Sequence, residues 1–292
     1  MTFRDSLRTK DFVVTAHVNL PWAPDAESLI RQGEILRPAV DAVQLTDNPG
    51  AQVHMSGLAA AALLLRQGID PIVHMTCRNR NRVALQSDLI GAAALGVTSV
   101  LLMRGDRMPE SMKPKVSSIF DTRAKELMAF VQDLKDAETV ALASDFLVGA
   151  AAKIFDPDTD WTPDNLVSKC DAGANFVQTQ LCLDMGVVRN YMARIVASKL
   201  IHRLNFIMAL SPLPSADVAH WIRDNVRGAL IPESIIERME QASDPECEGI
   251  EICGELLQEV ATIPGVSGAN LSTLGNLETI PAAIDASGVR SP

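Results

Sequence analysis

The chain has 292 residues, of which 47% are hydrophobic, 21% charged and only 4% aromatic, so it can bury a large core of small and branched side chains. Its formal net charge of −10 makes nucleic acid and anionic membranes poor partners for the surface as a whole. The five cysteines form no Cys-x-x-Cys pair, and no signal-peptide core, bilayer span or metal-ligand spacing is apparent, so we expect a cytoplasmic protein with reduced thiols and no metal.

Short β-branched or apolar runs alternate with longer segments of helical spacing along the chain. The predicted strands cover Phe12–Val18, Ala42–Leu45, Ile72–Met75, Ser99–Met103, Phe146–Ala151, Phe176–Gln180, Asn205–Met208 and Gly268–Leu271. The predicted helices cover Asp25–Leu36, Ser56–Arg66, Arg82–Leu95, Asp121–Leu134, Pro163–Ala172, Asp184–Ala197, Ser215–Asn225, Glu233–Ala242, Gly249–Ile263 and Leu277–Ala286. Several helices start at Asp, Ser or Pro and several end at Gly, as capping preferences require.

Strands that alternate with helices predict a parallel sheet, and the eight strands found here are the number that closes a (β/α)8 barrel. The competing open sheet usually carries Gly-x-Gly-x-x-Gly after its first strand. Here that strand runs into Asn19-Leu20-Pro21-Trp22, which contains no glycine. We therefore predict an α/β fold with one TIM-barrel domain over residues 1–292, in which Asp106–Ser118 forms a long mobile loop.

Polar side chains follow almost every predicted strand, and the C-terminal strand ends of such a barrel form its active site. They are His17 and Asn19, Thr46-Asp47-Asn48, His74 and Thr76, Arg104-Gly105-Asp106, Gln178-Thr179-Gln180, Ser211, and Asn270 with Ser272. Each has a structural alternative, such as a core histidine, a turn cap or, for Arg78 and Arg80, a solvated charge. The set lacks paired carboxylates, a metal cluster and a Gly-x-Ser-x-Gly elbow, and it suits the hydrogen-bonding edge of a flavin or pterin.

These same segments resemble motifs of the methylenetetrahydrofolate reductase family in its short bacterial form. The resemblance rests on Leu45–Pro49, His74–Asn81, Leu85–Leu89, Arg104–Asp106, Lys169 with Asp171–Phe176, Thr179-Gln180, Gly249–Ile252 and Ile263–Val266. It implies a homo-oligomeric flavoprotein barrel in which NADH or NADPH reduces bound FAD. The flavin then exchanges a hydride with a reduced folate, which interconverts 5,10-methylenetetrahydrofolate and 5-methyltetrahydrofolate.

The resemblance also implies roles for residues at matching positions. Thr46, His74, Arg104 and Asp106 are expected at the flavin, Asn165 and Lys169 elsewhere on the cofactor, and Gln180, Asp106 and Ser211 at the folate, with His17 and Asp106 in catalysis. The prediction depends on His74, Asp106 and Gln180 meeting around one cavity.

The chain departs from the family pattern at the first strand. The family carries a glutamate there, followed by two prolines, whereas this chain has His17 and only Pro21. The glutamate supplies the proton that opens the imidazolidine ring. Histidine can be an acid near pH 7, but a charged imidazolium at about 4 Å would repel the developing iminium by about 4 kcal/mol, close to a thousandfold in rate.

The fifth strand departs as well, because Gly149–Lys153 replaces a Tyr-Pro-Glu-like exit used in cofactor binding. Two alternatives therefore stay open beside the reductase. One is a tetrahydrofolate-dependent methyltransferase or demethylase component without flavin, which works with a corrinoid or methyl-carrier partner. The other is a folate-binding paralogue without catalysis.

Overall fold

The computed structural model of the chain describes residues 1–108, 116–136 and 146–290. Parallel strands form a closed barrel in the order β1-β2-β3-β4-β5-β6-β7-β8, and β8 pairs with β1. They are β1 (Val13–His17), β2 (Ala42–Leu45), β3 (Pro71–Thr76), β4 (Ser99–Met103), β5 (Leu147–Ala152), β6 (Phe176–Leu181), β7 (Asn205–Leu210) and β8 (Val266–Leu271). The predicted (β/α)8 barrel is confirmed, and every predicted strand overlaps an observed one.

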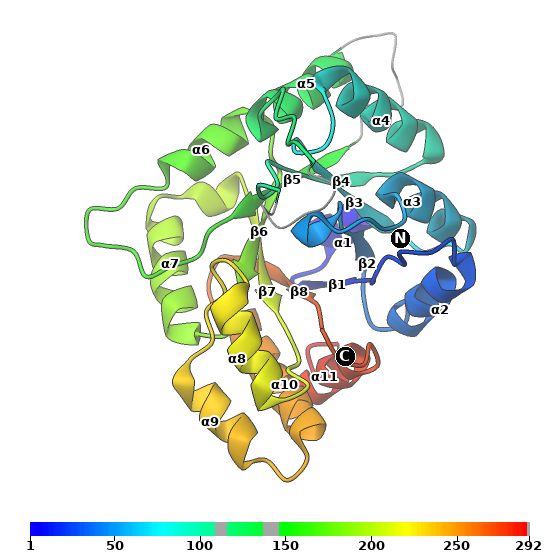
Figure 1. The fold of residues 1–292 in the computed structure, drawn as a ribbon. Helices are drawn as coiled ribbons and strands as arrows, with labels where there is room; N and C mark the ends of the chain where they lie inside the picture. The colour runs from blue at the N-terminus through cyan, green and yellow to red at the C-terminus, as the bar shows by residue number, and fades with distance from the viewer. Residues whose placement is uncertain (109–115, 137–145, 291–292) are drawn as a thin grey trace.

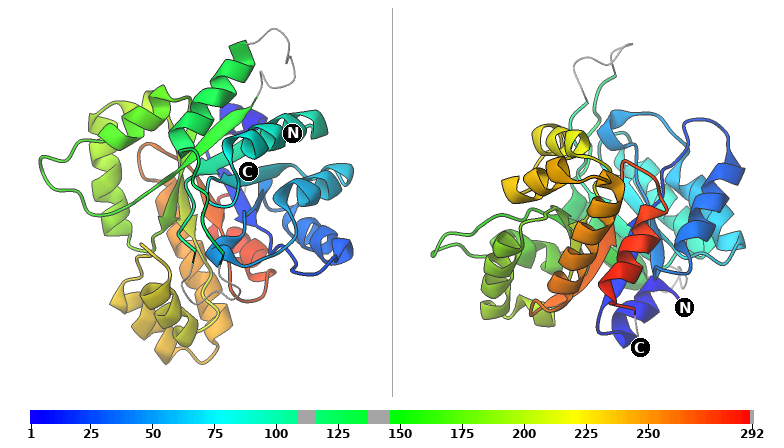
Figure 2. Two further views of the ribbon diagram at one scale, coloured as in Figure 1. Left: turned by 45° about the horizontal axis from the view of Figure 1, so that its top comes forward. Right: turned by 90° about the horizontal axis from the view of Figure 1, so that it is seen from below.

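Helices surround the barrel, as Figures 1 and 2 show. They are α2 (Ala26–Leu36), α3 (Gly57–Arg66), α4 (Arg82–Leu95), α5 (Ala124–Asp136), α6 (Asp164–Asp171), α7 (Met185–Ala197), α8 (Ala216–Asn225), α9 (Glu233–Gln241), α10 (Pro245–Ala261) and α11 (Thr279–Ser287), with short 3-10 turns at Pro49–Ala51 and Leu200–His202. Helix α10 begins four residues before the predicted Gly249. The reason is that Asp244 caps it, accepting a hydrogen bond from the Cys247 amide at 3.1 Å, and Pro245 suits the first helical position.

The N-terminal helix α1 (Phe3–Thr9) was not expected from the sequence. Its Phe3 is fully buried and packs into an apolar layer at the starts of the strands, where its ring lies edge-on to Phe176 with centroids 5.4 Å apart. Gly149 of β5 leaves the room for Phe176, because a Cβ there would lie 2.2 Å from the ring. The N-terminal end of the barrel is thereby packed with apolar side chains.

Asp70, next to α1, should destabilise the protein at neutral pH. Burial raises the pKa of this carboxyl to about 6, although the Phe3 amide donates it a hydrogen bond. The folded state therefore holds this proton more tightly than the unfolded state, and the free energy of unfolding falls as pH rises from about 4 to 6. Asp70→Asn keeps an acceptor for the Phe3 amide, so we expect it to raise that free energy at pH 7 by about 1 to 3 kcal/mol.

Urea unfolding at pH 7 and pH 4 checks this expectation, because the gain should vanish at pH 4. Asp41 provides the contrast. Hydrogen bonds from Arg290 and Lys10 outweigh its burial and lower its pKa, so Asp41→Asn should destabilise at pH 7. If Asp70→Asn does not raise the free energy of unfolding at pH 7, burial does not destabilise the Asp70 carboxylate.

The inward side chains of the next layer are polar. Thr15, Gln44, His74, Gln178 and Asn270 are all buried, and they come from β1, β2, β3, β6 and β8. Alternation along each strand aims them into the barrel. A buried polar layer costs free energy unless its groups are paired, and the hydrogen bonds described below provide that pairing.

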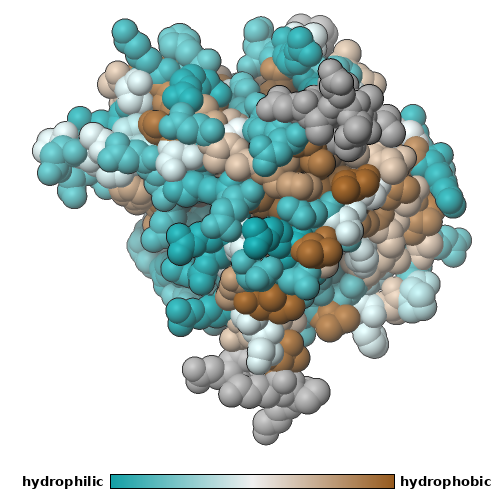
Figure 3. Space-filling model, turned by 90° about the horizontal axis from the view of Figure 1, so that it is seen from above, coloured by the Kyte–Doolittle hydropathy of each residue, from teal (hydrophilic) through white to brown (hydrophobic). Residues whose placement is uncertain are grey.

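The surface and the thiols add little about function. The face seen in Figure 3 carries mostly hydrophilic side chains, with apolar groups scattered between them. Across the described residues, every helix is too short or too polar to cross a bilayer. The cysteines are free, and Cys77, Cys182 and Cys253 are buried, while Cys170 is half-buried and Cys247 is exposed.

Candidate functional site

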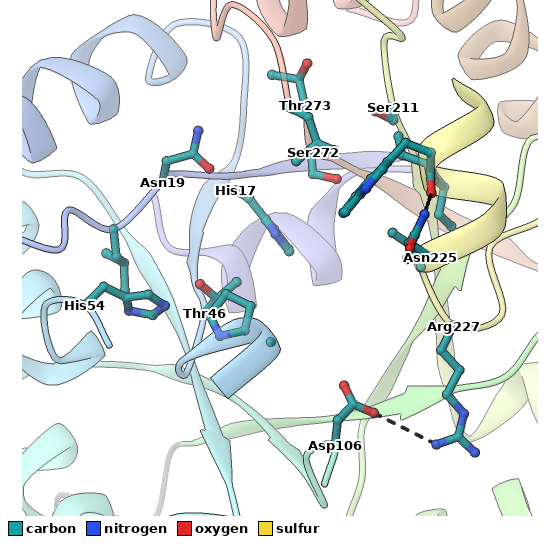
Figure 4. A pocket seen from close by; sticks show the side chains of 18 of the residues that line it. His17, Asn19, Thr46, His54, Asp106, Ser211, Asn225, Arg227, Ser272 and Thr273 are labelled. Carbon is teal, nitrogen blue, oxygen red and sulfur yellow. Dashed lines mark hydrogen bonds and ion pairs between the residues drawn. The ribbon is translucent and has the colours of Figure 1, made fainter. Parts of the chain in front are cut away.

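The main cavity, of about 1110 Å³, opens at the C-terminal ends of the strands. It brings together five of the residues predicted to bind a ligand or act in catalysis, namely His17, Thr46, Arg104, Asp106 and Ser211, and also the strand-end residues Asn19 and Ser272. Figure 4 shows His17, Thr46, Asp106 and Ser211 arranged around one space, with His17 near its middle. The volume is in the range of small-molecule sites, so this cavity is the candidate active site.

The other residues predicted to bind the cofactor or the folate lie elsewhere. Asn165, Lys169 and Gln180 line a second cavity of about 390 Å³, and His74 lines a third, smaller one beside Asp47 and Arg80. His74, Asp106 and Gln180 therefore do not meet around one cavity, contrary to the prediction. His74 still connects to the main cavity indirectly, because it belongs to the polar layer directly below His17.

A β-bulge explains the position of Gln180. The pairing of β6 with β7 shifts register between Gln178 and Leu181, and such a shift turns the following side chains to other faces of the sheet. As a result Leu181 lines the main cavity and Gln180 lines the second one. Its Oε1 is buried against Gly228 and has no hydrogen-bond partner among the described residues.

Asp106 and Arg104 lie at the rim of the main cavity. The Asp106 side chain is 72% exposed, and its carboxylate lies 4.0 Å from the Arg227 guanidinium, which reaches across from the segment after α8 (Figure 4). The Arg104 guanidinium lies 4.4 Å above the Phe120 ring. Exposed pairs of this kind contribute little to stability, so these charges are free to meet a ligand.

His17 and His74 share one hydrogen-bond acceptor at the bottom of the main cavity. The Oε1 of Gln44 lies 3.2 Å from His17 Nε2 and 2.7 Å from His74 Nε2. Burial lowers the pKa of His17 to about 4, although the Gln44 hydrogen bond acts in the opposite direction. Burial, and secondarily the charge of His17, lowers the pKa of His74 well below its usual value. Both rings are therefore uncharged at neutral pH.

The third-strand motif is structural. Arg78 is only 2% exposed, and its guanidinium donates to the Asn48 carbonyl at 2.6 Å. Asp47 accepts hydrogen bonds from the amide and hydroxyl of Thr76, at 2.7 and 2.8 Å, and from Arg80. These arginines hold the loops after β2 and β3 together, so their interpretation as solvated charges is wrong.

The second cavity offers groups that suit an aromatic ring and a phosphate. The rings of Phe155, Trp161 and Tyr191 pack against one another with centroids 5.4 to 5.7 Å apart. Lys169 donates to the Ala151 carbonyl at 2.6 Å, and its pKa is lowered by burial first and by Lys125 second. A phosphate group would restore the favourable surroundings that this ammonium lacks.

Several residues of the main cavity were not expected from the sequence, and His54 and Trp221 are the most informative of them. Both ring nitrogens of His54 are buried without a partner in the described part of the chain. Trp221 of α8 is 52% exposed although it lines the cavity. Neither residue follows a strand directly, so the positions of the strand ends could not reveal them.

The fold and the cavity define a (β/α)8 barrel with a small-molecule site at its C-terminal strand ends. A sequence model of methylenetetrahydrofolate reductase matches residues 2–288. The chain therefore belongs to the methylenetetrahydrofolate reductase family, as its motifs predict. A probable methylenetetrahydrofolate reductase (NADPH) of Caenorhabditis elegans is 25% identical over 243 residues, which are 78% of this chain and 34% of that protein. The chain thus spans about a third of the length of this curated relative.

Solved structures share the fold at low sequence identity. An uncharacterized protein from Clostridium thermocellum, which binds two copies of 5-methyl-5,6,7,8-tetrahydrofolic acid, superposes with a TM-score of 0.66 at 12% identity over 97% of both chains. A tryptophan synthase of Mycobacterium tuberculosis superposes with a TM-score of 0.52 at 12% identity over 99% of this chain and 97% of that chain. At such identities the likeness concerns the barrel alone.

Proposed function

We propose that this protein is a flavin-dependent oxidoreductase that interconverts 5,10-methylenetetrahydrofolate and 5-methyltetrahydrofolate, with NADH or NADPH as the co-substrate. The proposal includes a cytoplasmic, homo-oligomeric enzyme whose subunit is one barrel domain. Family membership carries it, and the main cavity supports it. A flat pterin can stack on an apolar wall that includes Leu181, Trp221 and Leu274, while polar groups at the strand ends meet its edge.

The donor set of the second cavity fits the outer part of FAD. Asn165 and Lys169 would hold its phosphates and ribose, and the aromatic rings of Phe155 and Trp161 would contact its adenine. Thr46, Arg104 and Asp106 in the main cavity would hold the flavin ring, and His74 would act from below through Gln44. When bound, the flavin supplies the chemistry of hydride transfer to and from the folate carbon.

The visible spectrum of the purified protein tests the proposal. We expect flavin absorption that bleaches anaerobically with NADH or NADPH and returns with 5,10-methylenetetrahydrofolate. Lys169→Met should lower the affinity for FAD at least about tenfold, the effect of losing one charge-assisted hydrogen bond. Lys199→Met is the matched control, because Lys199 is exposed and does not line the second cavity.

The other outcomes separate the alternatives. A colourless protein that binds 5-methyltetrahydrofolate but no FAD would overturn the reductase and favour the methyltransferase or demethylase component. A protein that binds both ligands without turnover would favour the non-catalytic paralogue. A protein that binds no reduced folate would remove every function proposed for the main cavity.

A further inference from the structure

Gln44 lies at the centre of the polar layer. Its Oε1 faces His17 Nε2 and His74 Nε2. Its Nε2 donates to the Thr15 hydroxyl at 2.9 Å and to Gln178 Oε1 at 2.5 Å. Gln44 is 1% exposed, so water does not replace these partners. An amide has two N–H donors and two acceptor lone pairs, and all four are used here.

The neighbouring bonds orient this amide. The Thr15 hydroxyl donates to Asn270 Oδ1 at 3.0 Å, so it can only accept from Gln44. Gln178 Oε1 is an acceptor as well, which places both N–H groups of Gln44 on that side. The oxygen of Gln44 is therefore turned to the two histidines, and each ring must donate to it from Nε2.

A neutral imidazole that carries its proton on Nε2 has an unshared electron pair on Nδ1. The Nδ1 atom of His17 has no hydrogen-bond partner among the described residues and is not enclosed by them. His17 lines the main cavity, so this lone pair is accessible from the cavity. Burial keeps the ring uncharged at neutral pH by lowering its pKa to about 4.

We propose that Gln44 is a positioning residue that fixes His17 as the Nε2–H tautomer, so that Nδ1 serves as a proton acceptor for the bound folate. The catalytic consequence rests on the proposed function; the tautomer does not. In the ring-closing direction, N10 attacks the methylene carbon of the N5 iminium. The N10–C bond forms, the C=N5 π pair moves to N5, and the N10 proton passes to His17 Nδ1. Ring opening is the reverse.

Other ionisable groups contact this ring or line the same cavity. They are His74 from β3 and, around the main cavity, His54, Arg104, Asp106, Arg107 and Arg227. None of these carboxylates or guanidiniums bonds to His17. We therefore expect the protonation and the tautomer of its ring to depend on Gln44 rather than on the charges at the cavity rim.

Long-range proton–nitrogen NMR on protein labelled with 15N-histidine tests the tautomer without any ligand. The signals are assigned with His17→Gln and His74→Gln. We expect His17 to be the neutral Nε2–H form from pH 8 to about pH 5. An Nδ1–H form would overturn the proposal, because it requires the amides of Gln44, Gln178 and Asn270 all to be reversed.

Variants at position 44 separate positioning from general structural support. Gln44→Glu keeps the acceptor and adds a charge, so His17 should stay in the Nε2–H form while its titration midpoint rises by at least about one pH unit. Gln44→Met removes the acceptor and should give a mixture of tautomers. Gln32→Met is the matched control, since Gln32 bonds the Asn19 backbone at the cavity mouth and not His17, and it should change neither property.

The results are decisive in each case. A single Nε2–H form in Gln44→Met would refute the role of Gln44. If Gln44→Met does not fold, the wild-type tautomer and the titration of Gln44→Glu decide the question. If His17 is the Nε2–H form but the protein does not turn over folate, the positioning role of Gln44 is kept and only the proposed function is refuted.

Discussion

Replacing His17 by glutamine should slow the oxidation of 5-methyltetrahydrofolate by about 10²- to 10⁴-fold, the usual contribution of a general base. Glutamine can still hydrogen-bond to Gln44, whose Oε1 lies 3.2 Å from His17 Nε2, but it cannot accept the N10 proton. Stopped-flow spectroscopy measures the effect directly, because reduction of the flavin by NADH or NADPH should keep its rate while exchange with the folate becomes slow. Equal losses in both half-reactions would mean that His17 supports the cofactor site instead.

Glutamate at the same position should have the opposite effect on the reduction of 5,10-methylenetetrahydrofolate. The pKa of His17 is lowered to about 4, so its ring is uncharged at pH 7 and the expected repulsion of an iminium does not arise. What the chain lacks at pH 7 is a proton to donate. A half-buried carboxyl retains its proton to higher pH than a solvated one, and once ionised it stabilises the iminium.

We therefore expect His17→Glu to raise the rate of folate reduction at least about tenfold at pH 7. Single-turnover reduction of 5,10-methylenetetrahydrofolate by the prereduced enzyme is the measurement, with His17→Gln as the control for loss of the imidazole. A rate that is unchanged or lower in His17→Glu would show that supply of a proton does not limit this direction. A faster His17→Glu variant would instead indicate that the native histidine suits the oxidation of 5-methyltetrahydrofolate, in which the site must accept a proton.

The sequence predicted the barrel well because its strands are buried on both sides. Runs such as Ser99–Met103 are short, mostly apolar and bounded by polar or turn residues, which is the pattern of parallel strands. Helix α1 was missed because its seven residues are mostly polar. Its one large buried side chain, Phe3, packs against residues of several strands, which come together only in the folded barrel. Short helices owe their stability to such tertiary contacts.

The candidate site was predicted less completely, because side-chain direction depends on register. His17, Thr46 and Asp106 line one cavity, as their positions at strand ends predict. The bulge that turns Gln180 away was not anticipated, since nothing in the sequence of Phe176–Leu181 marks the extra residue. Gln44 was not singled out either, because a lone amide inside a strand becomes informative only when its partners on the other strands are known.

A second large effect is expected at Gly249, which belongs to a segment that resembles the family. A Cβ at this position of α10 would lie 1.8 Å from the backbone oxygen of Leu213 and 2.8 Å from its carbonyl carbon. The obstacle is backbone in the loop after β7, so no rotamer change relieves it. We expect Gly249→Ala to lower the free energy of unfolding by at least about 3 kcal/mol, measured by urea or thermal unfolding.

Gly91 supplies the matched control. It lies inside α4, and a Cβ there would meet no atom within 4 Å. Gly91→Ala should therefore stabilise the protein by about 0.5 to 1 kcal/mol, since alanine restricts the unfolded chain and favours helix. If both variants behave alike, the close approach of α10 to the β7–α8 loop is wrong. If only Gly249→Ala is destabilised, the role of this glycine is to let α10 pack closely against the loop after β7.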